Sequence, residues 1–259
     1  MTGSARKVVL ITGAARRVGA GIARALAAAG WDVAVHHRGG ADEAAALAQA
    51  LNAAGARAET FQADLGAASE RDALIPAVVE RFGRIDALVN NASLFRYDTL
   101  QTLTPGSWDA HLAANLTAPV FLIRDFAAAV AARDGQGVVV NILDHKIDSP
   151  NPDFFAYTAG KLGLAGLTRT LAMGLAPRVR LCGISPGLIL RSGDQTEAEY
   201  QAAWRDTPLG RGATIDDVAG AVRFVLETPS LTGQNLTLDG GESLVGRARD
   251  VAFDEGLLS

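Results

Sequence analysis

Short apolar runs alternate with longer stretches rich in alanine and leucine along the chain. The apolar runs show no strict alternation of polar and apolar positions, which is typical of strands in a parallel sheet covered on both faces. The expected strands are residues 7–12, 32–36, 57–62, 87–90, 137–143, 178–185 and 235–238. The expected helices are residues 18–29, 42–54, 69–82, 107–132, 155–176 and 215–227. This pattern predicts an α/β fold with a doubly wound parallel sheet of seven strands.

The stretch 191–215 breaks this rhythm, because it is polar, contains glycine and proline, and carries two aromatic residues. We interpret it as a mobile substrate loop with a short helix. No low-complexity linker divides the chain, and 259 residues lie near the upper limit of one hydrophobic core. The sequence therefore predicts a single domain over residues 1–259.

Composition and charge exclude several classes of protein. A chain with 49% hydrophobic and 20% charged residues is typical of globular proteins, and a net charge of −4 argues against nucleic acid as the main partner. The first apolar run is too short for a signal peptide or a membrane span. The single cysteine, Cys182, fits a reducing cytoplasm, and the four histidines are not grouped with it at metal-ligand spacing. We expect a cytoplasmic protein without a metal site or a membrane partner.

A glycine-containing turn, TGAARRVGAG, follows the first expected strand and opens the first expected helix. Gly13, Gly19 and Gly21 provide positions without a Cβ, so a pyrophosphate could approach the free N–H groups of the helix. An ordinary turn is the alternative, but the place between strand and helix favours a dinucleotide site.

The end of the second expected strand indicates which dinucleotide binds. His36, His37 and Arg38 stand where an NAD site usually has an acidic residue, and Arg16 and Arg17 add charge from the glycine turn. Such cations would hold a 2′-phosphate, so the sequence predicts NADP(H). Solvated surface charge is the alternative for Arg16 and Arg38.

Nearby acidic residues have other expected roles. Asp42 and Glu43 come too late to bind the ribose and are expected to open the next helix. Asp64 ends the third expected strand, where its carboxylate could accept a hydrogen bond from the adenine amino group. A loop or N-cap aspartate is the alternative.

Tyr157 and Lys161 lie four residues apart and share one face of an expected helix. A neighbouring ammonium and a positive nicotinamide ring would lower the pKa of the phenol, so Tyr157 could exchange a proton with a substrate. Lys161 could also bind the nicotinamide ribose. The alternative is an exposed Tyr/Lys pair.

The motifs TGAARRVG, LVNNAS, NLTAPVFL, YTAGK, SPG and LDGG, in this order, resemble the short-chain dehydrogenase/reductase family. The resemblance implies a Rossmann fold with strand order 3-2-1-4-5-6-7, Tyr157 as the acid/base, and Asn115 as the anchor of a water relay through Lys161. The expected cofactor-binding residues are Gly13, Arg16, Arg17, Val18, Gly19, His36, His37, Arg38, Asp64, Leu65, Asn91, Ala92, Ser93, Tyr157, Lys161, Pro186, Gly187 and Leu188.

Departures from the family pattern point to one branch of it. Arg17 replaces the usual middle glycine, Ser93 ends the NNAS motif with Phe95 close behind, and Asp144 stands at or next to the usual serine. Cys182 stands where many members carry Asn. Together these residues resemble the pteridine reductase branch, and LAPRVRLCGISPGLIL is similar to the bacterial dihydromonapterin reductases.

A pterin is a flat polar ring, which Phe95 could stack against while Arg17 and Ser93 bind its heteroatoms. Asp144 would orient or recharge Tyr157 as it protonates a ring nitrogen, whereas a carboxylate would repel the alkoxide that forms from a ketone. The expected function is NADPH-dependent reduction of a dihydropterin, such as dihydrobiopterin or dihydromonapterin. Alternatives are a loop role for Asp144, a core or rim role for Phe95, and a cofactor-only role for Arg17.

Two other functions stay open. The first is a ketoacyl or sugar carbonyl reductase of the same fold. The second is a catalytically silent NADP(H)-binding regulator. We also expect a homotetramer, because small residues alternate with leucines on helix 155–176 (Gly160, Gly163 and Gly166 with Leu164, Leu167 and Leu171). The alternative is that this face packs on the sheet. The C-terminal stretch from Leu244 is expected to close a neighbouring pocket or to fray.

Overall fold

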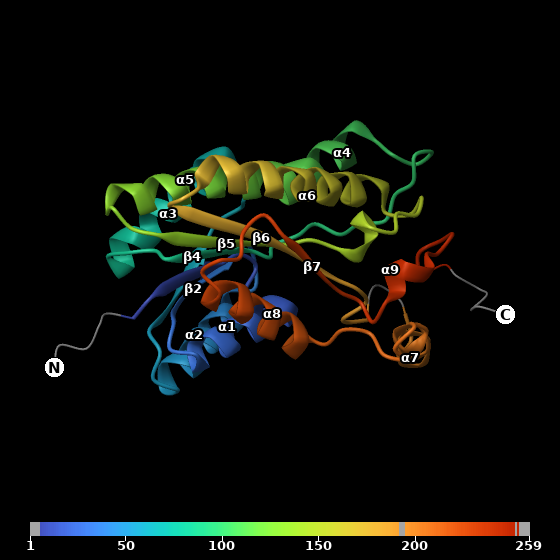
Figure 1. The fold of residues 1–259 in the computed structure, drawn as a ribbon, viewed down its shortest axis with the longest axis horizontal. Helices are drawn as coiled ribbons and strands as arrows, with labels where there is room; N and C mark the ends of the chain where they lie inside the picture. Colours follow the sequence, from blue (N-terminus) through green and yellow to red (C-terminus); the bar gives the residue numbers. More distant parts are fainter. Residues whose placement is uncertain (1–5, 192–194, 252, 254–259) are drawn as a thin grey trace.

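One parallel sheet of seven strands forms the centre of the structure, a computed structural model that describes residues 6–191, 195–251 and 253 (Figure 1). The strand order is β3-β2-β1-β4-β5-β6-β7, as the family resemblance implied. The strands are β1 Val8–Ile11, β2 Asp32–His37, β3 Ala58–Gln62, β4 Ala87–Asn90, β5 Gly137–Ile142, β6 Val179–Pro186 and β7 Asn235–Leu238. The order reverses between β1 and β4, and such a switch point opens a crevice at the carboxyl ends of the strands.

Helices cover both faces of this sheet (Figure 1). On one face lie α1 Arg17–Ala28, α2 Ala41–Ala53 and α8 Ile215–Glu227. On the other face lie α3 Ala68–Phe82, α4 Pro105–Leu112, α5 Ala118–Ala132 and α6 Phe155–Leu175. Val9 and Ile11 of β1 pack on the α1 side, while Val8 and Leu10 pack on the α5 side. Successive strand residues face opposite helix layers, so both sets must be apolar, which explains the unbroken apolar runs.

The helix expected at 107–132 contains a π-helical turn, Ala113–Thr117, between α4 and α5. Pro119 has no N–H, so the Asn115 carbonyl lacks its α-helical partner, which favours the wider turn. By length and composition Pro105–Ala132 is the one described helix that could cross a membrane. Here its residues Leu122 and Phe126 are buried in the core between the sheet and α3.

The small-residue face of α6 is divided between the interior and the surface. Added Cβ atoms at Gly160 and Gly163 would meet Asn115 and Leu116 of the π-helical turn, and Leu164 is buried. Only Gly166 and Leu167 of that alternating set are exposed, with Leu171 partly buried. Close packing within the chain therefore already uses most of this set, against the π-helical turn.

Two short helices lie near the carboxyl ends of the strands (Figure 1). Helix α7, Glu197–Arg205, is the helix expected within the loop 191–215, and Thr196 and Glu199 form its capping box. Residues 192–194 of that loop lie outside the described residues. Helix α9, Glu242–Val245, follows β7 and was not predicted from the sequence.

Candidate active site

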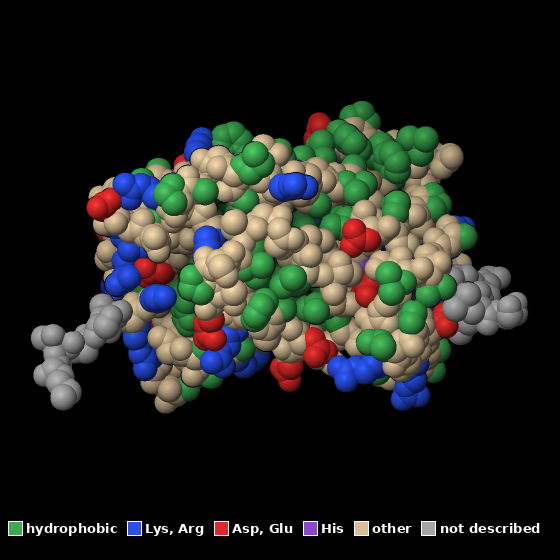
Figure 2. All heavy atoms as spheres, in the orientation of Figure 1, with side chains coloured by type: hydrophobic (Ala, Val, Ile, Leu, Met, Phe, Trp, Pro, Cys, Tyr) green, Lys and Arg blue, Asp and Glu red, His purple; other side chains and the backbone are tan. Residues whose placement is uncertain are grey.

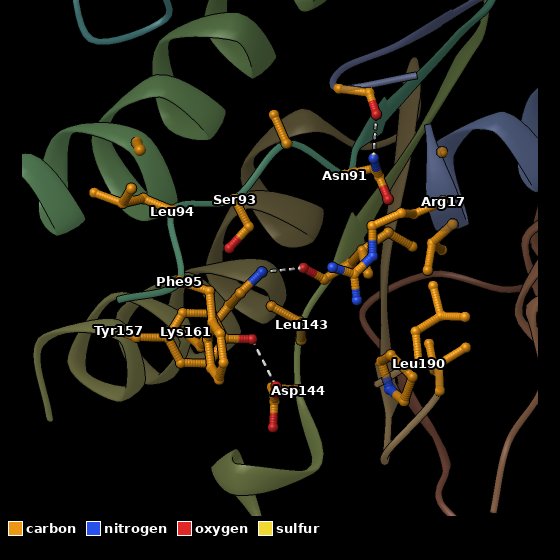
Figure 3. Close-up of a pocket in the computed structure, with 18 of the residues that line it drawn as sticks. Arg17, Asn91, Ser93, Leu94, Phe95, Leu143, Asp144, Tyr157, Lys161 and Leu190 are labelled. Atoms are coloured by element: carbon orange, nitrogen blue, oxygen red, sulfur yellow. Dashed lines mark hydrogen bonds between the residues drawn. The ribbon is translucent and has the colours of Figure 1, made fainter. Parts of the chain in front are cut away.

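A cavity of about 790 Å³ lies at the carboxyl ends of the strands (Figure 3). The described residues that line it include every cofactor- and substrate-contact residue predicted from the sequence, together with Asp144. Asn115 is not among them. The cavity is thus large enough, and in the right place in the fold, for a nucleotide with a small substrate.

The glycine turn forms a cradle that side chains would fill. Gly13 has φ +62, and a Cβ there would lie 3.0 Å from the Ala92 Cα atom. A Cβ on Gly19 would collide with the Gly13 carbonyl oxygen. The chain can pass this closely only without side chains, which leaves the N-terminal N–H groups of α1 open to a phosphate. Gly21 serves a different purpose from the one expected, since a Cβ there would collide with Ile215 of α8.

Thr12 and Asn91 lock this turn to the end of β4. Thr12 Oγ1 accepts hydrogen bonds of 2.9 Å from the main-chain N–H groups of Asn91 and Ala92. The Asn91 side-chain amide donates to the carbonyls of Thr12 and Gly13, at 2.8 and 3.1 Å (Figure 3). Asn91 therefore shapes the cavity chiefly by holding the turn.

His36 is a neutral structural residue here and not the expected cation. Its Nδ1 accepts a hydrogen bond of 3.0 Å from the Gly13 N–H, so Nε2 carries the proton and donates to the Ala63 carbonyl at 3.1 Å. Burial lowers the pKa of His36 to about 4, although the Ala63 carbonyl opposes the shift. The ring connects the glycine turn, the end of β2 and the residue after β3.

The remaining basic residues fit a 2′-phosphate better. Arg38 is exposed at the rim of the cavity. His37 is buried, and its Nδ1 has no hydrogen-bond partner among the described residues. Arg16 contacts Glu43 at 3.1 Å across an exposed ion pair. An orphaned imidazole nitrogen beside an exposed guanidinium suits an anionic oxygen, and no carboxylate from the end of β2 competes.

Asp64 makes a local turn at the end of β3. Its Oδ1 accepts from the Gly66 N–H at 2.9 Å, while its own N–H donates to Glu70 Oε2 at 2.7 Å. The loop role expected as the alternative is thus present, and the side chain also lines the cavity with Leu65.

Tyr157 reaches Asp144 across the floor of the cavity (Figure 3). Its hydroxyl donates a 2.6 Å hydrogen bond to Asp144 Oδ2. Asp144 follows β5 and caps a short 3-10 turn, with Oδ1 accepting from the Lys146 N–H at 2.9 Å. Tyr157 lies in the first turn of α6, whose N-terminus is capped by buried Asp98 through the Ala156 N–H at 3.0 Å.

The charge states of this pair differ from the sequence-based expectation. Burial raises the pKa of Tyr157 well above its usual value, and the Asp144 carboxylate raises it further. Lowering by Lys161 was expected, but Lys161 Nζ donates to the Ile142 carbonyl at 2.7 Å and lies 5.6 Å from the centre of the Tyr157 ring. Burial would raise the pKa of Asp144, but contacts with His145 and Tyr157 lower it to about 2. The pair is therefore a neutral phenol on an ionised carboxylate.

Burial lowers the pKa of Lys161 to about 8, with Asp144 opposing the shift. The ammonium lies beneath the cavity, where its remaining N–H groups are available to a bound ribose.

Asn115 differs from its expected position. Its side chain is buried, with Oδ1 accepting from the Leu94 N–H at 2.8 Å and from Ser93 Oγ at 3.2 Å, and Nδ2 donating to the Leu94 carbonyl at 2.9 Å. The side-chain amide thus fixes the segment after β4 and does not reach Lys161. A water relay to Lys161 would therefore have to use the main-chain groups of Asn115 in the π-helical turn.

Phe95 forms an aromatic wall with two residues at the start of α6. Its ring stacks on Phe154 with centroids 4.1 Å apart, and lies edge-to-face with Tyr157 at 4.7 Å. It is 42% exposed and lines the cavity, so it is a rim aromatic with surface left for a ligand. Arg17, with φ +53, also points into the cavity (Figure 3), and its guanidinium donates to the Arg191 carbonyl at 3.2 Å.

The C-terminal segment closes the substrate end of its own chain's cavity. Asp250 and Val251 line it, and Asp250 pairs with buried Lys146 at 2.7 Å. Arg249 makes two hydrogen bonds of 2.8 Å to Asp153, which is fully buried. The segment is thus held by ion pairs to the loop after β5.

Sequence reasoning missed several charged residues of the cavity. These are His145, Lys146, Glu242, Arg247 and Asp250. A contiguous DHK triplet after an apolar strand was the available signal for His145 and Lys146. The other three lie about a hundred positions away in the chain, and nothing in their local sequence pairs them with β5.

This chain is similar to known proteins in both sequence and fold. Residues 7–201 match the family model for short chain dehydrogenases. A 3-oxoacyl-[acyl-carrier-protein] reductase from Synechocystis sp. is 35% identical, over 93% of this chain and 98% of that protein. Two solved structures of FolM alternative dihydrofolate reductase 1 with NADP, from Brucella canis and Brucella suis, are each 40% identical over 93% of this chain. Their TM-scores are 0.87 and 0.89, and the matches cover 95% and 96% of those chains.

Proposed function

The chain belongs to the short-chain dehydrogenase family, and we propose that it reduces a dihydropterin to its tetrahydro form. The observation that carries the proposal is the 2.6 Å hydrogen bond between Tyr157 and an ionised Asp144 at the cavity floor. The similarity to the two alternative dihydrofolate reductases supports it, because the dihydrofolate in their name contains the same bicyclic ring system.

The cofactor of this oxidoreductase is NADP(H). The cradle at Gly13 and Gly19 fits the pyrophosphate, His37 and Arg38 fit the 2′-phosphate, and Lys161 fits the nicotinamide ribose. When bound, NADPH supplies a hydride to the substrate.

Tyr157 supplies the proton. Its hydroxyl lines the cavity, and its neutral form persists because burial and Asp144 both raise its pKa. A ring nitrogen that becomes more basic as the neighbouring carbon is reduced takes this proton. Asp144 orients the phenol before transfer and is the nearest group that can return a proton to it afterwards.

The charge on Asp144 selects the substrate. A ketone oxygen gains negative charge as it is reduced, and an ionised carboxylate hydrogen-bonded to the proton donor would repel it. A ring nitrogen is far more basic than a carbonyl oxygen and takes its proton before or as the hydride arrives, so less negative charge accumulates on it. Phe95 offers a ring surface to the flat substrate, and Ser93 and Arg17 offer polar contacts to its heteroatoms.

Carbonyl reduction is the second candidate, since the Synechocystis relative is a 3-oxoacyl-[acyl-carrier-protein] reductase by name. A silent NADP(H)-binding regulator is a weaker alternative, because the Tyr157 hydroxyl lines the cavity and is hydrogen-bonded to Asp144. NADPH oxidation followed with dihydrobiopterin, dihydromonapterin, dihydrofolate and an acetoacetyl thioester separates the three. The proposal expects turnover with a pterin, the second candidate expects it with the thioester, and the regulator expects none.

We also propose a homotetramer as the working assembly. Leu162, Leu167 and Met173 of α6 are exposed, Met173 by 77%, and hydrophobic side chains gather over the neighbouring α4 (Figure 2). A monomer that leaves these apolar side chains exposed has surface suited to a partner subunit. Gel filtration with light scattering tests this, and a monomer would contradict it.

A further inference from the structure

His145 lies behind the Asp144–Tyr157 pair, between two carboxylates. Its Nδ1 is 3.3 Å from Asp144 Oδ1, and its Nε2 is 3.7 Å from Glu242 Oε1. The Nδ1 contact is an ion pair without the alignment of a hydrogen bond. The imidazole therefore has a negative group at each ring nitrogen, which favours its doubly protonated form.

Glu242 is fixed in this position. It lies on α9, is buried, and its Oε1 accepts from Arg247 Nε at 3.1 Å. Arg247 also pairs with Asp206 at 2.9 Å. The second carboxylate thus comes from a distant part of the chain and is held by its own cation.

The charged groups around the imidazole come from three segments. Asp144 and Lys146 flank it in the chain, Glu242 faces it from α9, and Asp239 acts on it from the turn before α9. Burial would lower the pKa of His145, but Asp144 and then Glu242 raise it to about 9, with Lys146 opposing. His145 is an imidazolium at neutral pH.

We propose that His145 is a positioning residue that holds Asp144 in its ionised form and returns the proton that Tyr157 gives to the substrate. This role rests on the proposed function. As the substrate N–H bond forms, the Tyr157 O–H bond breaks. The Asp144 carboxyl group then turns so that Oδ1 aligns with His145 Nδ1 and takes its proton, and a second turn presents this proton to Tyr157 Oη. The imidazole is left neutral and takes a proton from water, so charge and protons balance over one turnover.

The first test is the pH profile of turnover. Because His145 must be protonated, turnover is expected to be level at neutral pH and to fall as the pH rises through about 9. Lys161 titrates in the same range, so the informative variant is Glu242→Gln, which removes a carboxylate that contacts His145 and not Lys161. The alkaline fall should move to lower pH by about one unit, and an unmoved fall would overturn the proposal.

His145→Asn should lower turnover about tenfold, with NADPH affinity unchanged. His111→Asn is the matched control, because His111 is another buried histidine whose partners among the described residues are Ser107 and the Arg96 main chain. It should affect stability and leave the pH profile in place. Turnover of His145→Asn within twofold of the wild type would reject the role.

A readout without substrate or cofactor separates this proposal from the proposed function. The chain has four histidines, so NMR titration can assign the His145 ring by its loss in His145→Asn. We expect that resonance to titrate near pH 9, and to move to lower pH in Asp144→Asn. Titration at the ordinary value near 6.5 would overturn the inference even if pterins are reduced. A protein that reduces no pterin would instead refute the proposed function.

Discussion

The Tyr157 hydroxyl and the Asp144 carboxylate are 2.6 Å apart, although thirteen positions separate them in the chain. The contact exists because α6 begins at Phe155, directly after Phe154 in the left-handed region, and because Asp144 caps its own short turn after β5. A phenol held on a carboxylate can give up its proton and regain it without leaving its position.

Tyr157→Phe should remove this proton donor and leave the cofactor cradle intact. We expect turnover to fall by about 10²- to 10⁴-fold, with NADPH affinity within twofold of the wild type. Steady-state NADPH oxidation and fluorescence titration with NADPH measure the two. Tyr200→Phe is the control, because Tyr200 lies on α7 and its hydroxyl donates to the Ile189 carbonyl and not to Asp144. Retained turnover in Tyr157→Phe would remove it from the acid role.

Cofactor choice should depend on Arg38. NADPH is expected to bind far more tightly than NADH, because Arg38 and His37 face no competing carboxylate at the end of β2. Arg38→Gln should weaken NADPH binding by about tenfold and leave NADH binding unchanged, as calorimetry would measure. Arg223→Gln, which breaks an exposed pair on α8, is the control. Equal affinities for the two cofactors in the wild type would refute this reading.

His36 should make the fold sensitive to acid. Its folded-state pKa, about 4, lies below the ordinary value of 6.5, so the unfolded chain binds a proton first as the pH falls. This contribution to stability is complete above pH 6.5 and is lost as the pH falls toward 4, by roughly 3 kcal/mol. Urea unfolding between pH 4 and 7 measures it. In His36→Gln the free energy of unfolding should change less steeply with pH between 4 and 7. An unchanged dependence on pH would exclude His36 as its source.

The fold and the nucleotide cradle were largely predictable, and the charge network was not. Val8 to Ile11 must be apolar because alternate residues face two helix layers, and Gly13 must lack a Cβ because Ala92 passes so close. Such constraints act on each residue separately and are visible in sequence.

The residues that sequence reasoning misjudged depend on distant partners. His36 looked like a cation because its partners, the Gly13 N–H and the Ala63 carbonyl, are main-chain atoms that no residue type reveals. The pKa of Tyr157 is raised, although lowering was expected, because Asp144 and not Lys161 contacts its hydroxyl. Only the fold decides which of two nearby charges makes the contact.

The ion pair between Lys146 and Asp250 should control the substrate end of the cavity. Asp250→Asn leaves a buried ammonium without its charge partner and should lower stability by about 3 kcal/mol. It should also raise KM for the pterin while NADPH affinity is unchanged, because Asp250 and Val251 line the cavity beyond Phe95. Thermal unfolding and steady-state kinetics measure both. Asp134→Asn, from an exposed pair with Arg178, is the control. An unchanged KM would mean that the C-terminal segment only braces the loop after β5.

The central claim is that the negative charge of Asp144 selects a ring nitrogen over a ketone oxygen. The most direct measurement is the ratio of kcat/KM for a dihydropterin to that for an acetoacetyl thioester, in the wild type and in Asp144→Ser. We expect a ratio well above one in the wild type that falls by about 10²-fold or more in Asp144→Ser, because the serine removes the repulsion and the proton return together. A ratio that is the same in both proteins would contradict it.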